Sequence, residues 1–487
     1  MRKSLTQRTL EGAAWIGGAS VARLALRVVS VAILARLLTP HEYGVVAGAL
    51  IAMDFASMIY GMGLAPTLVQ RKVVRPDHVA TAFFCALFVA LLAAAGMWYA
   101  APLIADLLQI PELSQILKVT AWLAPFGAFG VLSEALLARN MRVKSVAIRP
   151  LFSFSISNFL VAIPLAWHGF GYWSLVAMQG VDIVVSAVML GFAARKLLVW
   201  PRFSRRAFGE LWRLSLGFSV NQPFIYLSQN SDRFIIGRVL GTATLGIYTR
   251  ASFFTNTATT LFGNITRLSV FPAMAKVQQD QARLRSALLK SFSVLALLAL
   301  PVSAFCVIFA PELVDLLLGP KWHSAVAPFA ILSGTLYLSL AWRNCATLFQ
   351  ALGHPYWMTT AHICRAAGLI AGIWWIAPYG LTAICAVIGI VMGLTLAIML
   401  VIVKYAIHLP LRSVAAAHVR PLMMTAAASG LCLTAKALLP ELPGPALLML
   451  TLALLLSATC IFAFFNQERV LGFDGALALH RPRKGEG

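Results

Sequence analysis

The chain has 487 residues, of which 60% are hydrophobic and only 11% are charged, and its formal net charge is +22. A soluble protein with one buried core would leave much of this apolar surface in water, so the composition excludes an ordinary soluble enzyme or binding domain. Apolar runs of about 20 residues recur instead, which is the length that crosses a bilayer as a helix. The expected fold class is therefore an all-α polytopic membrane protein.

Fourteen candidate transmembrane spans follow one another along the chain. They lie at about 12–36, 44–69, 79–105, 116–138, 149–168, 172–194, 214–238, 246–271, 287–310, 324–352, 356–377, 380–404, 418–439 and 445–466. The connecting loops alternate between segments rich in Lys and Arg and segments with few of them. Because basic loops remain on the cytoplasmic side, both termini are expected in the cytoplasm. Most of the net charge then reports orientation, and no nucleic-acid partner is expected.

An internal repeat is visible in the spacing of several landmarks. Arg36 and Gly44 recur 202 positions later as Arg238 and Gly246, whereas Asp106 and Gly171 recur 209 positions later as Asp315 and Gly380. A nearly constant offset over separate landmarks indicates a duplication. Since each copy would hold six spans, both would enter the membrane in the same direction, as a parallel repeat about an axis along the membrane normal.

The repeat predicts the organisation of the chain. It divides into an N-terminal lobe at 1–194, a basic amphipathic cytoplasmic linker at 195–213, a C-terminal lobe at 214–404, a helix pair at 405–466 and a cytoplasmic tail at 467–487. No loop is long enough for a soluble catalytic domain, which argues against an enzyme. The seven cysteines stand singly in apolar runs, so neither a metal site nor a cofactor is expected. No cleaved signal peptide is expected either.

Polar residues inside the spans form stripes. Ser20, Arg23, Arg27 and Ser30 share one face of the first predicted helix, and Gln222, Tyr226, Gln229 and Arg233 share one face of the seventh. An ionisable group at membrane depth costs roughly 2.5–3.5 kcal/mol, so each needs a reason. The next span adds Arg250, Asn256, Asn264 and Arg267. We expect these stripes to line a central polar cavity between the lobes.

The predicted substrate-binding residues are the members of these stripes with polar groups suited to an anion or a sugar. They are Arg23, Arg27, Gln222, Tyr226, Gln229, Arg233, Arg250, Asn256, Asn264 and Arg267. Asp54 and Asp182 are candidates for coupling transport to an ion. The excess of deep basic groups favours an anionic substrate such as a pyrophosphate, which Arg can bind bidentately.

Other interpretations remain open for several of these residues. Arg250 and Arg267 lie near span ends and could extend to the lipid headgroups. Glu134 and Asp182 could instead pair with neighbouring helices. Aromatic residues such as Tyr226, Trp342 and Trp374 could stack on sugar rings or belong to the interfacial belt.

Four segments carry a resemblance to a known family. They read Leu-Leu-Thr-Pro-x-Glu-Tyr-Gly at 37–44, Gly-Leu-Ala-Pro-Thr-Leu-Val-Gln-Arg-Lys at 63–72, Tyr-Leu-Ser-Gln-Asn-x-Asp-x-x-x-Ile-Gly-Arg at 226–238 and Ala-Pro-Glu-Leu-Val-x-Leu-Leu-x-Gly-Pro-Lys-Trp at 310–322. As a set they resemble the Wzx-type polysaccharide flippases, a branch of the multidrug, oligosaccharidyl-lipid and polysaccharide (MOP) superfamily, and above all its colanic-acid and succinoglycan exporters.

The resemblance implies two six-helix lobes around a cationic cavity in the bacterial inner membrane. It also implies translocation of an undecaprenyl-pyrophosphate-linked oligosaccharide by alternating access, for synthesis of an exopolysaccharide, capsule or O-antigen. The expected partners are this lipid-linked oligosaccharide, membrane lipids, and the polysaccharide polymerase and export machinery. The alternatives are a multidrug or cation antiporter of the same superfamily and a membrane-embedded glycan polymerase. The sugars, the energy source and the oligomeric state are left open.

Overall fold

The computed structural model describes residues 5–61, 63–219, 222–353, 356–439 and 444–465. Every regular element in these residues is helical, as the composition predicts. Nine of the described helices are long and apolar enough to cross a membrane, or ten if the bent pair α5 and α6 forms one span. The all-α membrane fold is thus confirmed, whereas the count of fourteen spans stays a prediction.

Contacts divide the chain into two compact units. Unit 1 comprises Met1–Arg250, Leu317–Ser324 and Ala366–Leu381, and unit 2 comprises Ala251–Leu316, Ala325–Arg365 and Thr382–Gly487. The predicted lobe boundaries, linker and tail stay predictions; the tail at 467–487 lies outside the described residues.

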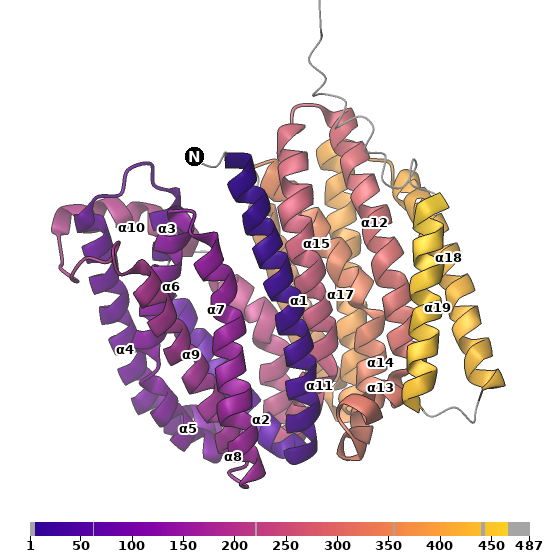
Figure 1. Cartoon of the computed structure of the whole chain (residues 1–487), viewed down its shortest axis with the longest axis horizontal. Coiled ribbons are helices and arrows are strands. Elements are labelled where there is room, and N and C mark those ends of the chain that lie inside the picture. The colour runs from indigo at the N-terminus through magenta and orange to yellow at the C-terminus, as the bar shows by residue number, and fades with distance from the viewer. Residues whose placement is uncertain (1–4, 62, 220–221, 354–355, 440–443, 466–487) are drawn as a thin grey trace, which may run out of the picture. The chain divides into compact units, whose positions relative to one another are not determined.

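Unit 1 holds the helices of the first half of the chain. They are α1 (Leu5–Leu37), α2 (Pro40–Gly61), α3 (Leu64–Gln70), α4 (Pro76–Leu108), α5 (Glu112–Ala121), α6 (Ala124–Arg139), α7 (Val143–Ser155), the π-helix η1 (Ile156–Ala162), α8 (Ile163–Trp167), α9 (Tyr172–Ala194), α10 (Arg205–Ser219) and the first part of α11 (Gln222–Lys276). Figure 1 shows α1 beside α7, and the two helices pack against each other. The segment α7–η1–α8 forms a single apolar span.

Small residues hold α4 close to its neighbours α2, α5 and α6. Its buried face carries a stripe of alanines, which are Ala82, Ala86, Ala90, Ala94, Ala101 and Ala105. Between lipid-embedded helices the driving force is close packing, and small side chains allow the backbones to approach. The stripe therefore explains how a helix with no buried charge is fixed in the unit.

Gly44 and Gly246, which the predicted repeat places at equivalent positions, make a reciprocal contact in unit 1. A Cβ built on Gly44 of α2 would lie 1.7 Å from the carbonyl oxygen of Thr242 on α11, and one built on Gly246 would lie 1.8 Å from the carbonyl oxygen of Pro40. Thr242 stands 202 positions after Pro40, as Gly246 does after Gly44. We call this pair the glycine contact. Nearby, Gly241 breaks α11 with φ of 81°, which separates the two predicted spans in that helix.

The basic segment at 195–213 packs against α3 and α4 through α10. The backbone N–H of Arg202 donates to the carbonyl of Ala80, and Thr81 Oγ1 donates to the carbonyl of Arg202. The N–H of Ser204 in turn donates to Thr81 Oγ1 at 3.2 Å. The start of this segment is therefore hydrogen-bonded to the first turns of α4.

Unit 2 holds most of the remaining helices. They are the second part of α11, α12 (Gln281–Ile308), α13 (Ala310–Leu317), α14 (Val326–Gly334), α15 (Leu336–Ala351), most of α17 (Leu381–Ile407), α18 (Leu411–Leu438) and α19 (Gly444–Phe465). α16 (Tyr356–Ile376) contributes to both units, and the 3₁₀ turns η2 (Pro320–Ala325) and η3 (Ala377–Tyr379) belong mainly to unit 1. Here α12 packs against α14, α15 and α18, and α18 packs against α19. A buried hydrogen bond of 2.5 Å from Ser291 to Asn344 joins α12 to α15.

Candidate functional site

Predicted basic residues from three separate stripes lie together in unit 1. Arg27 of α1 is within electrostatic range of Arg23 and of Arg250, and Arg250 is within range of Arg233 on α11. The guanidinium of Arg250 also lies 4.4 Å from the centroid of the Tyr43 ring, a cation–π geometry. We call Arg23, Arg27, Arg233 and Arg250 the arginine cluster. Such a concentration of guanidinium groups can bind a multiply charged anion.

Carboxylates lie at the edge of the arginine cluster. Asp182 of α9 is within electrostatic range of Arg23, and Asp54 of α2 is within range of Arg233. Both residues proposed for ion coupling therefore neighbour the cluster. Glu134 has a different role, since it forms an ion pair of 3.3 Å with Arg149 and so joins α6 to α7, which is one of the two interpretations left open.

Tyr226 links α11 to α2. Its hydroxyl donates a hydrogen bond of 2.8 Å to the carbonyl of Ile51, and its ring lies 5.5 Å from that of Phe55. The other two predicted residues on this stripe, Gln222 and Gln229, have exposed side chains. Within unit 1, Tyr226 is thus bonded to α2 and Arg233 is within electrostatic range of Asp54 on α2, whereas Gln222 and Gln229 are exposed.

The remaining predicted site residues belong to unit 2. Asn256 is exposed there, and its carbonyl accepts a hydrogen bond from Thr260 Oγ1. The side chains of Asn264 and Arg267 fall outside what the structure describes. These three residues stay candidates on the sequence argument alone.

Sequence reasoning missed partners on α7 and η1. Ser30, on the α1 stripe, donates a hydrogen bond of 2.7 Å to Asn158 in the π-helix η1, and Arg23 lies 5.8 Å from the centroid of the Phe154 ring. Single π-helical turns often mark functional sites. No residue pattern predicts a π-helix. Asn158 itself, however, is a polar residue in an apolar span, and this could have indicated a buried polar contact.

The sequence also did not predict the contacts of Glu210, which lies on α10. Its carboxylate contacts Arg71 and lies 3.3 Å from Arg75 Nη2. His78 Nδ1 accepts the Arg75 N–H, so its Nε2 carries the proton and donates to Glu210 at 3.0 Å. The hydrogen bond from His78, followed by the charges of Arg71 and Arg75, lowers the pKa of Glu210. These contacts fix α10 to the loop between α3 and α4.

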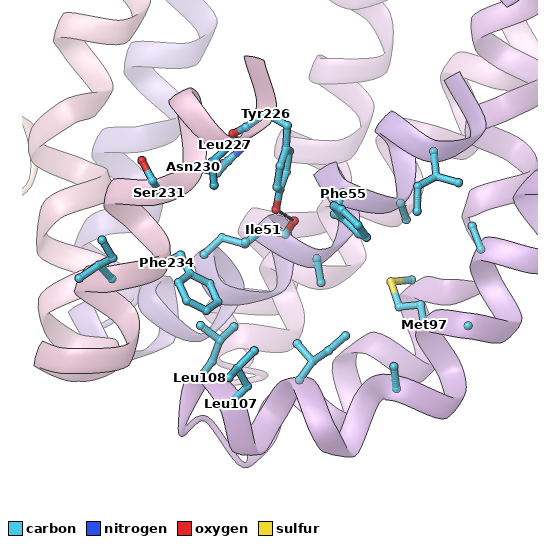
Figure 2. A pocket seen from close by; sticks show the side chains of 18 of the residues that line it. Ile51, Phe55, Met97, Leu107, Leu108, Tyr226, Leu227, Asn230, Ser231 and Phe234 are labelled. Carbon is cyan, nitrogen blue, oxygen red and sulfur yellow. Dashed lines mark hydrogen bonds between the residues drawn. The ribbon is translucent and has the colours of Figure 1, made fainter. Parts of the chain in front are cut away.

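A cavity of about 900 Å³ opens beside the arginine cluster, between α2, α4, α11 and α16. Its walls are almost wholly apolar, with Phe55, Leu107 and Phe234 among the side chains drawn in Figure 2. Tyr226 lies on its rim, with its hydroxyl directed to Ile51. The cavity was not predicted, because it arises from how separate helices diverge.

Comparison with known proteins agrees with this architecture. The structure superposes on that of the lipid II flippase MurJ in an inward closed conformation with a TM-score of 0.74, over 94% of this chain and 99% of the other, at 12% sequence identity. That identity shows a common fold and nothing more. A multidrug resistance MATE family transporter of the MOP superfamily, in an inward-facing conformation, shares this fold with a TM-score of 0.61 over 84% of this chain and 98% of the other, at 15% sequence identity.

Sequence comparison gives the family. Residues 33–327 match the family described as "Polysaccharide biosynthesis protein". The succinoglycan biosynthesis transport protein ExoT of Rhizobium meliloti (strain 1021) is 31% identical over 302 residues, 62% of this chain and 60% of that protein. The lipopolysaccharide biosynthesis protein WzxC of Escherichia coli (strain K12) is 24% identical over 334 residues, 68% of this chain and 67% of that protein. The chain belongs to the polysaccharide biosynthesis protein family, although its match spans only about three fifths of the length of ExoT.

Proposed function

We propose that this protein is a flippase that moves an undecaprenyl-pyrophosphate-linked oligosaccharide from the cytoplasmic to the periplasmic leaflet of the inner membrane. The product would serve synthesis and export of a surface polysaccharide. The observation that carries the proposal is the arginine cluster, in which side chains from α1 and α11 share one electrostatic environment. A transporter of a pyrophosphate-linked lipid needs such a group, because burying a diphosphate without cations is prohibitively costly.

In this proposal the arginines bind the substrate, and the neighbouring carboxylates balance their charge when the substrate is absent. Arg23 and Arg27 bind the pyrophosphate, with Arg233 and Arg250 adding positive charge from α11. Asp182 and Asp54 give the cations a counter-charge when the substrate is absent, so the empty site avoids unpaired charge repulsion. Substrate and carboxylate then compete for the same guanidinium groups, and release on the far side restores the internal pairs.

Alternating access would move one lobe against the other. Because α10 is bound to α3 and α4 through Glu210, it would move with them as part of one body and would not act as a free hinge. Both termini would lie in the cytoplasm, and the polymerase and export machinery would receive the product. Neither a cofactor nor a catalytic residue is part of the proposal.

An antiporter of the same superfamily is the second candidate, because two carboxylates lie beside the arginine cluster. A proton or sodium ion at Asp54 or Asp182 would suit a coupled carrier. The two proposals differ in the substrate that is transported. They can share an ion-coupled energy source, since a flippase could use the same carboxylates. A polymerase has no supporting observation among the described residues.

The test measures lipid-linked oligosaccharide in cells lacking this gene, complemented with the wild type, with Arg23→Ala/Arg27→Ala or with Arg420→Ala. Arg420 is exposed on α18 and controls for the loss of a positive charge outside the arginine cluster. We expect the repeat unit to accumulate on the cytoplasmic side after deletion, and to be cleared by the wild type and Arg420→Ala but not by the double variant. Unchanged lipid intermediates and surface polysaccharide after deletion would reject the flippase and favour the antiporter.

A further inference from the structure

The cavity beside the arginine cluster is built to exclude polar ligands. It is lined by apolar residues from four helices, including Ile59 and Val89, and by three polar residues of α11. The polar groups of two of them are already bonded to backbone: Tyr226 donates to the Ile51 carbonyl at 2.8 Å, and Asn230 donates to the Tyr226 carbonyl at 3.3 Å. The third, Ser231, is buried, and its hydroxyl is the one polar side-chain group of the three without a hydrogen-bond partner among the described residues. A sugar or phosphate would find few free partners in this space.

The size of the cavity points to a long hydrocarbon chain. Its volume of about 900 Å³ is near the upper end of the range for small-molecule pockets. If each carbon group takes roughly the 30 Å³ of a water molecule, the cavity holds roughly 30 of them. The terminal part of a polyprenyl chain would fill that space, and because the two acyl chains of a phospholipid need a similar volume, the labelling experiment has to distinguish these two occupants.

The cavity adjoins the polar site. Tyr226 lines the cavity and is within electrostatic range of Asp54 and Arg233, and Phe55 of the cavity wall directly follows Asp54. A single amphiphile could therefore place an anionic head at the arginines and an apolar chain in the cavity. Large apolar side chains stand open along the wall, with Phe55 48% and Trp374 67% exposed.

We infer that this cavity binds the polyprenyl chain of the lipid carrier while its charged head is at the arginine cluster. The inference rests on the proposed function and adds a second binding site, for the tail. The lining residues of α4 lie at 89–108, in the half remote from the basic loop at 71–75. On α2 the lining residues at 51–59 lie in the half that leads towards that loop, so the cavity extends across the middle of the membrane.

The test uses the purified full-length protein in phospholipid nanodiscs and a radiolabelled undecaprenyl phosphate with a diazirine in its terminal isoprene units. Peptides containing the lining residues of α2, α4 and α11 are expected to carry the cross-link. Gly96→Leu should reduce labelling about tenfold, which corresponds to about 1.4 kcal/mol of binding free energy. A Cβ at Gly96 meets no atom within 4 Å, so the larger side chain enters the cavity without distorting the helix.

The matched control is Gly430→Leu, at an exposed glycine of α18 that is equally open. Labelling in this variant should equal that of the wild type. The inference is overturned if Gly96→Leu labels as strongly as the wild type, or if a phosphatidylglycerol with a diazirine in its acyl chain labels the same peptides equally well. Because the assay requires no transport, cross-linking in the cavity together with normal glycan in the deletion strain would reject the proposed function and leave the tail site standing.

Discussion

The two halves of α2 differ in how they meet α11. In the first half, residues from Tyr43 to Ala49 are buried and Gly44 touches the backbone of Thr242, with no room for a methyl group. In the second half, Ile51, Phe55 and Ile59 line a cavity of about 900 Å³. One helix therefore combines a contact that tolerates no added atom with a surface that leaves space for a ligand.

The difference follows from side-chain size along the helix. The first half carries Gly44, Ala47, Gly48 and Ala49, and small residues allow helices in a membrane to approach closely. The second half carries Phe55 and Ile59, whose larger side chains line the cavity. The comparison teaches that a fixed end and an open end can be encoded in about six helical turns of sequence.

The largest effect is expected for Gly44→Ala. Its methyl carbon would lie 1.7 Å from the Thr242 oxygen, and a backbone atom cannot move aside as a side-chain end can. We expect a loss of about 3 kcal/mol of stability, the upper end of the usual cost of overpacking a tight site. The measurement is the fraction of detergent-solubilised protein that remains monodisperse on size exclusion after heating.

The same substitution at the partner glycine completes this test. Gly246→Ala would bring a methyl carbon to 1.8 Å from the Pro40 oxygen, so its destabilisation should match that of Gly44→Ala. Gly61→Ala, on the same helix as Gly44 but with nothing within 4 Å, is the control and should be tolerated. Wild-type heat stability in Gly44→Ala would remove the basis for the comparison.

Tyr226→Phe tests the junction between the two halves. The change removes the hydrogen bond to the Ile51 carbonyl while keeping the ring on Phe55. We expect a loss of about 1 kcal/mol, the usual net value of one hydrogen bond. Urea or heat denaturation followed by tryptophan fluorescence measures this change in the free energy of unfolding. A loss as large as that of Gly44→Ala would show that the closely packed part of α2 extends beyond Ile51.

Gly96→Ala should act in the opposite direction. Gly96 lines the cavity and has no atom within 4 Å of an added Cβ, so the alanine gains helix stability without a clash. The expected gain is about 0.5–1 kcal/mol. The same heating assay distinguishes it from Gly44→Ala, and a loss of stability would show that the cavity is closed in solution.

The smallest effect is expected at Glu210 of α10, the helix that packs against α3, which follows the second half of α2 in the chain. The pKa of Glu210 is lowered, so its contribution to stability is present above its ordinary pKa of 4.5 and is lost as the pH falls through the lowered value. Glu210→Gln should abolish this pH dependence, because glutamine does not titrate. Hydrogen exchange of α3, next to α10, is the readout, with the amides of Tyr43–Ala49 as the internal control, because they should not respond.

The sequence was most informative where residue type and spacing act within one helix. The stripes of α1 and α11 were readable because Arg23, Arg27 and Arg233 interrupt apolar runs at helical spacing, and the structure places these three in one electrostatic environment. The family resemblance was carried by segments such as 37–44 and 226–238, and the family match over 33–327 includes both.

What the sequence could not provide depends on relations between elements. Glu210 is one acid in a basic segment, and nothing local to it indicates that Arg71, Arg75 and His78 lie across from it. The cavity has no sequence signature, since Leu107 or Phe234 would look the same in a filled core. Both features depend on how the helices pack against one another in three dimensions.

The glycine contact also has a consequence for how such a chain could arise. Gly44 meets Thr242 and Gly246 meets Pro40, so in terms of the predicted repeat position i of one copy touches position j of the other, and j touches i. This is the defining relation of an isologous interface between two identical subunits. A shorter ancestor holding one copy could have assembled through the same pair of surfaces as a homodimer. Fusion of the two genes would then have turned an interface between subunits into an intramolecular one.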